Sequence, residues 1–159
     1  MPDIDKLFEK AEKYLQKQKF ESALETYQEI SRYQPNDEEV LQNLGDLSLR
    51  LNRSAEGLRY LSQLVDLYIK KNDVTKAVAT CRKMLKTSPQ DVNTMMKLGP
   101  LLEKTSKAAE ALEVFREALA QYRAAGAATQ ILDCLQRIVK LDPNNLNAQV
   151  ELGEQAVKV

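Results

Sequence analysis

Few side chains in this sequence have the type and spacing that catalysis or metal binding requires. The 159 residues include no histidine, which removes the commonest general base and a common zinc ligand. Carboxylate pairs occur, such as Glu38 with Glu39 and Glu110 with Glu113, but such pairs are frequent on any charged helix. No nucleophile, base and orienting group come together in the sequence. We therefore expect a protein without enzymatic activity, cofactor or bound metal.

The cysteines and glycines exclude two further kinds of site. Cys81 and Cys134 are far apart in the sequence, and we expect both thiols to be reduced and buried as small apolar groups. The five glycines are too few for a glycine-rich phosphate loop, and the G-x-x-x-x-G-K pattern is absent. The sequence therefore favours a binding or structural protein.

The charges of the chain balance overall but not locally. The 23 Lys and Arg residues equal the 23 Asp and Glu residues, which argues against nucleic acid or an anionic membrane as the main partner. Residues 1–40 carry a net charge of −4 and residues 41–91 a net charge of +4. No apolar run is long enough to span a membrane, and the first residues lack a signal pattern. We expect a cytoplasmic protein.

The residues that break helices recur with one spacing. Three of the five prolines are evenly spaced, with 54 positions from each to the next, and three Leu-Gly pairs share that spacing: Pro35, Pro89 and Pro143, and Leu44-Gly45, Leu98-Gly99 and Leu152-Gly153. Residues 38–91 laid over 92–145 without a gap are identical at ten positions. The sequence therefore predicts one repeat domain over residues 1–159. It would hold a partial unit (1–37), two full units (38–91 and 92–145) and the start of another (146–159).

The apolar residues of each unit recur at the three- and four-residue steps of helices, and no strand-like alternation occurs. We expect nine helices, at residues 3–18, 20–33, 38–51, 54–71, 73–87, 92–104, 107–124, 127–141 and 146–158. Pro100 would lie inside one of them. Because proline lacks the amide that would bond Met96, we expect a kink or a displaced turn there.

The apolar residues also resemble the tetratricopeptide repeat, which spaces small and large apolar side chains over about 34 residues on two antiparallel helices. Residues 4–37 match it with Leu7, Ala11, Tyr14, Ala23, Tyr27, Ile30 and Pro35. Residues 58–91 and 112–145 match it again, although Ile131 stands where the motif prefers alanine. The period of this chain is longer than the motif by about 20 residues, which hold one more helix. The resemblance implies an all-α solenoid, a right-handed superhelix of about nine antiparallel helices.

Tetratricopeptide repeat proteins typically bind a partner peptide or helix in a concave groove, as adaptors or scaffolds. The groove positions of the motif fall on Asp5, Phe8, Glu12 and Leu15, on Glu39, Gln42, Asp46 and Leu49, and on Asn93, Met96, Pro100 and Glu103. Exposed apolar side chains among carboxylates at these positions would suit a basic or amphipathic partner peptide. The alternative is that the apolar members belong to the core and the charges form an ordinary solvated helix surface.

Two other binding functions fit the sequence poorly. Family members that act as chaperone cofactors bind a carboxylate with a Lys and an Asn, whereas the matching positions here hold Phe8 and Glu12. Binding of RNA by related helical repeats would call for a basic groove, whereas the first unit is acidic. We therefore expect neither a carboxylate clamp nor a nucleic-acid site.

A self-associating scaffold without a peptide ligand is the main alternative to an adaptor. The last expected helix, 146–158, opens a further unit instead of presenting the polar outer surface of a terminal repeat. Its apolar side chains Leu146, Val150 and Val157 would then contact a second copy of the chain. The same pattern leads us to expect that the chain is the N-terminal part of a longer protein.

Overall fold

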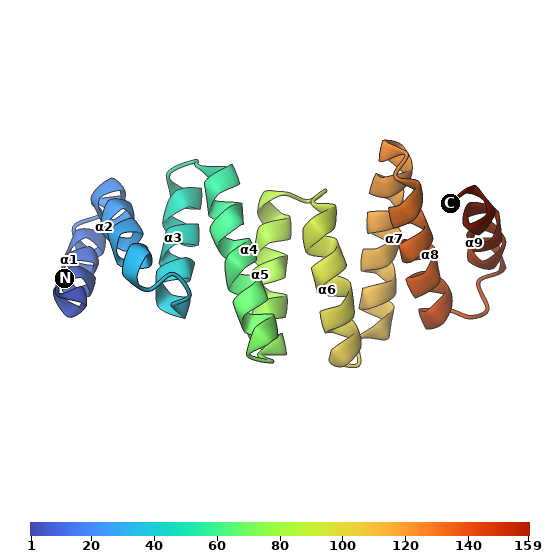
Figure 1. Ribbon diagram of the computed structural model, residues 1–159, viewed down its shortest axis with the longest axis horizontal. Coiled ribbons are helices and arrows are strands. Elements are labelled where there is room, and N and C mark those ends of the chain that lie inside the picture. The colour runs from blue at the N-terminus through green and yellow to red at the C-terminus, as the bar shows by residue number, and fades with distance from the viewer. The chain divides into compact units, whose positions relative to one another are not determined.

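A computed structural model describes all 159 residues, and every regular element in it is an α-helix (Figure 1). The helices confirm the expected nine, and their ends differ from the expected ones by at most two residues. They are α1 (Ile4–Gln16), α2 (Phe20–Tyr33), α3 (Glu38–Arg50), α4 (Ser54–Lys70), α5 (Val74–Thr87), α6 (Val92–Lys104), α7 (Ala108–Ala125), α8 (Ala128–Leu141) and α9 (Leu146–Lys158).

The helices form two compact units, Met1–Thr80 and Cys81–Val159, with the boundary inside α5. In the first unit α2 packs against α1 and α3, and α3 packs against α4. In the second unit α7 packs against α6 and α8, and α8 packs against α9. Each unit is therefore a stack in which consecutive helices cover one another's apolar sides. The assignment of the whole chain to one domain stays a prediction.

The turns between the helices repeat with the spacing seen in the sequence. Five residues adopt a left-handed backbone, in two series with the period of the prolines: Gln18, Asn72 and Gly126, and Asn52 and Ser106. In each turn the next amide bonds a carbonyl five residues back, as from Lys19 N to Tyr14 O at 2.8 Å. This bond after a left-handed residue ends a helix and satisfies its last carbonyls. The helix ends thus follow the same period as the prolines.

The helices that follow the three prolines begin at capping side chains. Asp37, Asp91 and Asn145 precede α3, α6 and α9, and each accepts a hydrogen bond from a first-turn amide at 3.0–3.2 Å. Such a cap satisfies an amide that has no partner within the helix. These three residues also follow the common period, so the same signal starts the extra helix in every unit.

Two of the Leu-Gly glycines lie where a neighbouring helix comes very close. A Cβ atom on Gly45 would lie 2.6 Å from Cδ2 of Leu61 in α4, and one on Gly99 would lie 2.4 Å from Cζ of Phe115 in α7. Because real Cβ atoms do not approach other atoms so closely, a larger residue would force the neighbouring side chain or helix to move. The equivalent Gly153 of α9 has no such neighbour within 4 Å.

The sequence predicts that the two cysteines are reduced and buried and that Pro100 causes a kink or a displaced turn. Neither cysteine forms a disulfide and both are buried, as expected. Burial raises the pKa of the Cys134 thiol to about 11, and its sulfur lies 3.6 Å from the sulfur of Met96. The helix α6 continues through Pro100 without interruption, so the turn is not displaced there. A kink at Pro100 stays a prediction.

Candidate functional site

Tyr27 of α2 lies where residues of three helices meet. Its side chain is only 1% exposed, and its ring meets the ring of Phe8 edge to face, with centroids 6.3 Å apart and planes at 73°. Phe8 and Glu12 lie one turn apart on α1, and Glu39 lies in the first turn of α3. The charges of Glu39 and Glu12 also act on the Tyr27 hydroxyl. We call these four residues the Tyr27 cluster: Phe8, Glu12, Tyr27 and Glu39.

The Tyr27 cluster carries two negative charges without counterions. Glu12 and Glu39 are exposed, and the side chain of neither forms an ion pair or a hydrogen bond. Burial raises the pKa of Tyr27 to about 12, and the charges of Glu39 and Glu12 contribute to that rise. The Tyr27 hydroxyl therefore stays protonated at neutral pH, within reach of the field of both carboxylates.

The Tyr27 hydroxyl has no hydrogen-bond partner within the protein. Ser48 Oγ is the side-chain atom that is both fully enclosed and without a partner. The Tyr27 oxygen is not enclosed in that way, so the small exposed part of this side chain includes its hydroxyl. That exposed part is very small, since Tyr27 as a whole is 1% exposed.

The apolar groove residues lie between the two alternatives considered for them, since they are neither fully exposed nor fully enclosed. Phe8, Leu15, Leu49 and Met96 are all half-buried. Phe8 and Leu15 pack against the core of the first unit, Leu49 lies over Gly57 of α4, and Met96 contacts Cys134. The physical reason is that these side chains fill the gaps between adjacent helices, where they are removed from water. The apolar members are thus partly core residues.

The polar groove residues are more accessible. Glu12, Glu39, Gln42 and Asn93 are exposed, and Asp46 and Glu103 are half-buried. Glu39 and Gln42 line an open hollow of about 400 Å³ together with Asn36, Asp37, Glu38 and Lys71. The structure therefore brings Glu39 and Gln42 of α3 together at one hollow of the first unit, which holds no residue of α1. Asn93, Met96 and Glu103 belong to the second unit.

The second unit contains a hollow that the sequence did not lead us to expect. It measures about 330 Å³ and is lined by Arg116, Leu119, Arg123, Leu135, Ile138, Asn145, Asn147, Ala148 and Glu151. Its two arginines are engaged: Arg123 pairs with Glu151, and Arg116 lies 2.8 Å from Glu113 and 3.6 Å from Asp142. The motif positions that give Phe8 and Leu15 in residues 4–37 give Arg116 and Arg123 in residues 112–145. The sequence signal for this hollow is therefore that two arginines stand at motif positions that hold apolar residues in the first repeat.

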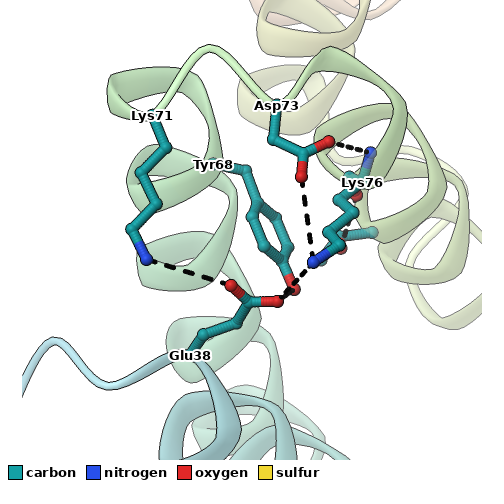
Figure 2. A network of polar contacts seen from close by, with 6 residues as sticks. Glu38, Tyr68, Lys71, Asp73 and Lys76 are labelled. Atoms are coloured by element: carbon teal, nitrogen blue, oxygen red, sulfur yellow. Dashed lines mark hydrogen bonds and ion pairs between the residues drawn. The ribbon is translucent and has the colours of Figure 1, made fainter.

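A network of polar contacts joins the start of α3 to the end of α4 and the start of α5 (Figure 2). The Glu38 Oε1 atom accepts hydrogen bonds from the Tyr68 hydroxyl at 3.1 Å and from Lys76 Nζ at 2.8 Å. Lys71 lies 3.9 Å from the other oxygen of Glu38, and Lys76 lies 3.8 Å from Asp73. The hydrogen bond from Lys76 is the main cause that lowers the pKa of Glu38. The two carboxylates and the two lysines of this network neutralise one another, so its role is structural.

Replacing Glu38 with glutamine is expected to reduce the amount of stability that the protein loses when the pH is lowered. The pKa of Glu38 is lower in the folded protein than its ordinary value of 4.5, so its stabilisation is complete above that value. It is lost as the pH falls through the lowered pKa. Urea unfolding near pH 7 and near pH 3 should therefore differ less for Glu38→Gln than for the wild type, by up to about 1 kcal/mol because the pair is near solvent. If both proteins lost the same unfolding free energy between pH 7 and pH 3, Glu38 would not have this stabilising role.

The expected contact residues of α9 lie on the surface. Leu146, Val150 and Val157 are 71%, 62% and 87% exposed, and Gly153 lies between them on the same side of the helix. Ala148 is the one buried residue of α9. The structure thus leaves an apolar stripe on α9, while the contact with a second copy stays a prediction.

No helix of the structure combines the length and apolarity needed to cross a membrane. No group of three or more Cys, Asp or Glu side chains is arranged to hold a metal ion.

Comparison with known proteins identifies the repeat. Nine helices with recurring caps and turns define a helical-repeat protein. Two models of the tetratricopeptide repeat match the sequence, over residues 8–71 and 58–91, and together they span more than half of the chain. The chain belongs to the tetratricopeptide repeat family. Both matches contain residues 58–71, so α4 ends one match and begins the next, and the second match coincides with the repeat expected at 58–91.

Solved structures were compared as well. The crystal structure of MamA protein is 14% identical, with a TM-score of 0.50, and the match covers 98% of this chain and 90% of that one. This likeness supports the helical-repeat fold. A thermophilic tetratricopeptide repeat protein of Thermus thermophilus is 13% identical, with a TM-score of 0.37 and coverage of 98% and 100%. No curated protein sequence matches the chain.

The family sets the general class of function. Tetratricopeptide repeat proteins are interaction modules that generally lack catalytic activity, and the chain is therefore a protein–protein interaction module.

Proposed function

We propose that the protein is an adaptor or scaffold that binds a basic or amphipathic segment of a partner protein across α1 and α3. The observation that carries the proposal is the pair of exposed carboxylates, Glu12 and Glu39, which lie near Tyr27 without a counterion. The other polar groove positions of these two helices are exposed or half-buried: Gln42 and Asp46 of α3 and Asp5 of α1. The corresponding residues of α6 in the second unit would form a separate contact: Asn93, Met96 and Glu103.

Charge favours a basic partner over an acidic one. Residues 1–40 carry a net charge of −4, and the carboxylates of Glu12 and Glu39 are paired with no cation. An acidic segment would meet uncompensated repulsion there, whereas a basic segment would gain two attractions and would be steered toward the site. The attraction should weaken as salt rises, because the screening length falls to about 8 Å at physiological ionic strength.

The apolar side chains of α1 favour an amphipathic partner. Phe8 and Leu15 lie two turns apart on the same side of α1, with Glu12 between them, and both remain partly exposed after packing. A partner helix carries apolar and basic side chains at matching three- and four-residue steps. Such a helix could cover the exposed parts of Phe8 and Leu15 while its cations meet the carboxylates.

Reversing both charges is expected to abolish most of this binding. The probe is a fluorescein-labelled amphipathic peptide with lysines on one side, measured by anisotropy against the full chain. Glu12→Lys with Glu39→Lys should weaken binding about tenfold or more, because two attractions are lost and two repulsions are added at exposed positions. The matched control is Glu25→Lys with Glu29→Lys, which makes the same charge change on the opposite side of α2 from Tyr27.

Equal effects of the two double variants would overturn the proposal, because binding would then depend on overall charge alone. Preference for the same peptide with glutamates in place of its lysines would overturn it as well.

Self-association is the second candidate function, and the apolar stripe of α9 favours it. Leu146, Val150, Gly153 and Val157 follow a 4-3-4 spacing, which is that of a helix-pairing seam, and Gly153 leaves room for an opposing side chain. Sedimentation over a range of concentrations should then show a dimer that Val150→Lys converts to a monomer. A wild type that stays monomeric at the highest concentration would rule this candidate out.

A further inference from the structure

We infer that the hollow lined by α7, α8 and α9 is a binding site for one aromatic side chain of a partner protein. The site lies within the Cys81–Val159 unit, so it goes beyond the proposed function of α1 and α3 and does not depend on it. Its volume of about 330 Å³ is near the lower end of the range of about 300–1,000 Å³ that small-molecule pockets span. The hollow therefore has room for one large side chain.

An aromatic ring fills the equivalent space in the first repeat. Two periods before Leu135 and Ala148 stand Tyr27 and Val40, which are 1% and 0% exposed and belong to the same core cluster. The ring of Phe8 packs against that cluster and meets the ring of Tyr27 edge to face. Because leucine and alanine are smaller than the tyrosine and valine that they replace, the second unit keeps a hollow where the first has a ring.

The buried part of the hollow is apolar. Four of its lining side chains are at most 7% exposed: Leu119, Leu135, Ile138 and Ala148. An apolar side chain that covers them removes further apolar surface from water, which favours binding. A charged group would lose its hydration against these side chains without gaining a hydrogen bond from them.

The charged groups at the rim of the hollow are already paired. Arg123 Nε donates a hydrogen bond to Glu151 Oε1 at 3.0 Å. Arg116 lies 2.8 Å from Glu113 and 3.6 Å from Asp142. A partner carboxylate would have to displace one of these acids, and a partner cation would meet the two arginines. An uncharged side chain has neither cost.

Charge complementarity favours an aromatic ring over an aliphatic side chain. The N–H groups of a guanidinium lie in its plane, so pairing with carboxylates leaves its flat surfaces available to the negative surface of a ring. This chain already contains that arrangement. Arg137 lies 3.3 Å from Asp133, while its guanidinium lies 5.5 Å from the centroid of the Phe115 ring. Arg116 and Arg123 can bind a partner's ring in the same way.

The test compares peptides that differ only in one apolar side chain. A short capped peptide with a central phenylalanine among glycines is titrated into the ¹⁵N-labelled full chain, beside versions with leucine or alanine at the centre. We expect the phenylalanine peptide to shift the backbone amides of Leu119, Ile138 and Ala148, with a dissociation constant on the order of 1 mM. The leucine peptide should bind about two- to fivefold more weakly, because it lacks the attraction between cation and ring. The alanine peptide should cause no shifts there.

Ala148→Val is the decisive variant, because it places the residue of the first repeat at the hollow and fills part of it. We expect it to weaken binding of the phenylalanine peptide about tenfold, while its melting temperature stays equal or rises. The matched control is Ala156→Val, which makes the same change at an exposed position of α9 and should leave binding unchanged.

A double variant tests the part played by the guanidinium groups. Arg116→Lys with Arg123→Lys keeps both charges but removes the flat surfaces. We expect this variant to bind the phenylalanine and leucine peptides equally well.

Three results would overturn the inference. The first is that the phenylalanine peptide leaves the amides of the hollow unshifted, or binds the wild type and Ala148→Val equally. The second is that the wild type binds the phenylalanine and leucine peptides equally. The third is that the wild type self-associates and Ala148→Val makes it monomeric, because a second copy would then occupy the hollow. None of them affects the proposed function, which is tested with a basic peptide whose apolar residues are leucines.

Discussion

Replacing Phe115 with alanine is expected to destabilise the Cys81–Val159 unit by about 3–5 kcal/mol. The ring is fully buried on α7, it lies directly against the backbone of Gly99 on α6, and the guanidinium of Arg137 on α8 lies 5.5 Å from its centroid. Because the glycine has no side chain that could move into the space, the cavity left by the ring would stay largely empty. Urea unfolding of the full chain followed by circular dichroism measures the loss.

The control for this variant is Val157→Ala, at a position that is 87% exposed. Its effect should stay within about 0.5 kcal/mol. If Phe115→Ala lowered the free energy of unfolding by less than about 1 kcal/mol, the packing of this ring between α6 and α7 would not stabilise the unit as argued.

The same substitution at two equivalent glycines is expected to change the stability of the protein in opposite directions. A Cβ on Gly99 would lie 2.4 Å from the buried ring of Phe115, so Gly99→Ala should destabilise the protein by about 1–3 kcal/mol. A Cβ on Gly153, at the equivalent position of the next unit, meets nothing within 4 Å. Gly153→Ala should therefore stabilise the protein by about 0.5–1 kcal/mol, because alanine favours the helix over glycine.

The same unfolding experiment checks both glycine variants. Gly45→Ala is an intermediate case, because its close neighbour is the flexible end of Leu61. If Gly99→Ala and Gly153→Ala changed the free energy of unfolding in the same direction, close helix packing would not explain the recurring Leu-Gly pairs.

The helices of this protein could be predicted because their start and stop signals repeat. Asn72 and Gly126 tolerate the left-handed backbone that they adopt, so the turns at these positions were expected. Gln18 adopts the same backbone with a φ of 57°, although glutamine has no special tendency to do so. Its place one period before Asn72 is the only sequence signal for it. The backbone geometry there is imposed by the packing of α1 on α2 rather than by the residue itself.

The candidate site could be predicted only in part. Glu12 and Glu39 followed from their positions in the repeat, because exposed polar positions depend mainly on which side of a helix they occupy. The sequence left open whether Phe8 and Leu49 would be exposed or buried, since their burial depends on how closely the neighbouring helices approach. Tyr27 was expected only as a core residue of the repeat. That its hydroxyl lies without a partner near two carboxylates depends on three helices at once, which no local pattern encodes.

We expect a basic segment to bind the first unit across α1 and α3, and backbone amide chemical shifts test this binding most directly. The ¹⁵N-labelled full chain is titrated with the amphipathic peptide that carries lysines on one side. We predict that the largest shifts fall on residues 5–15 and 36–46 and on Tyr27, with little change at Glu25, Glu29 or α9. Shifts centred on α9 or on the hollow beside Arg116 and Arg123, or no shifts at all, would contradict binding across α1 and α3.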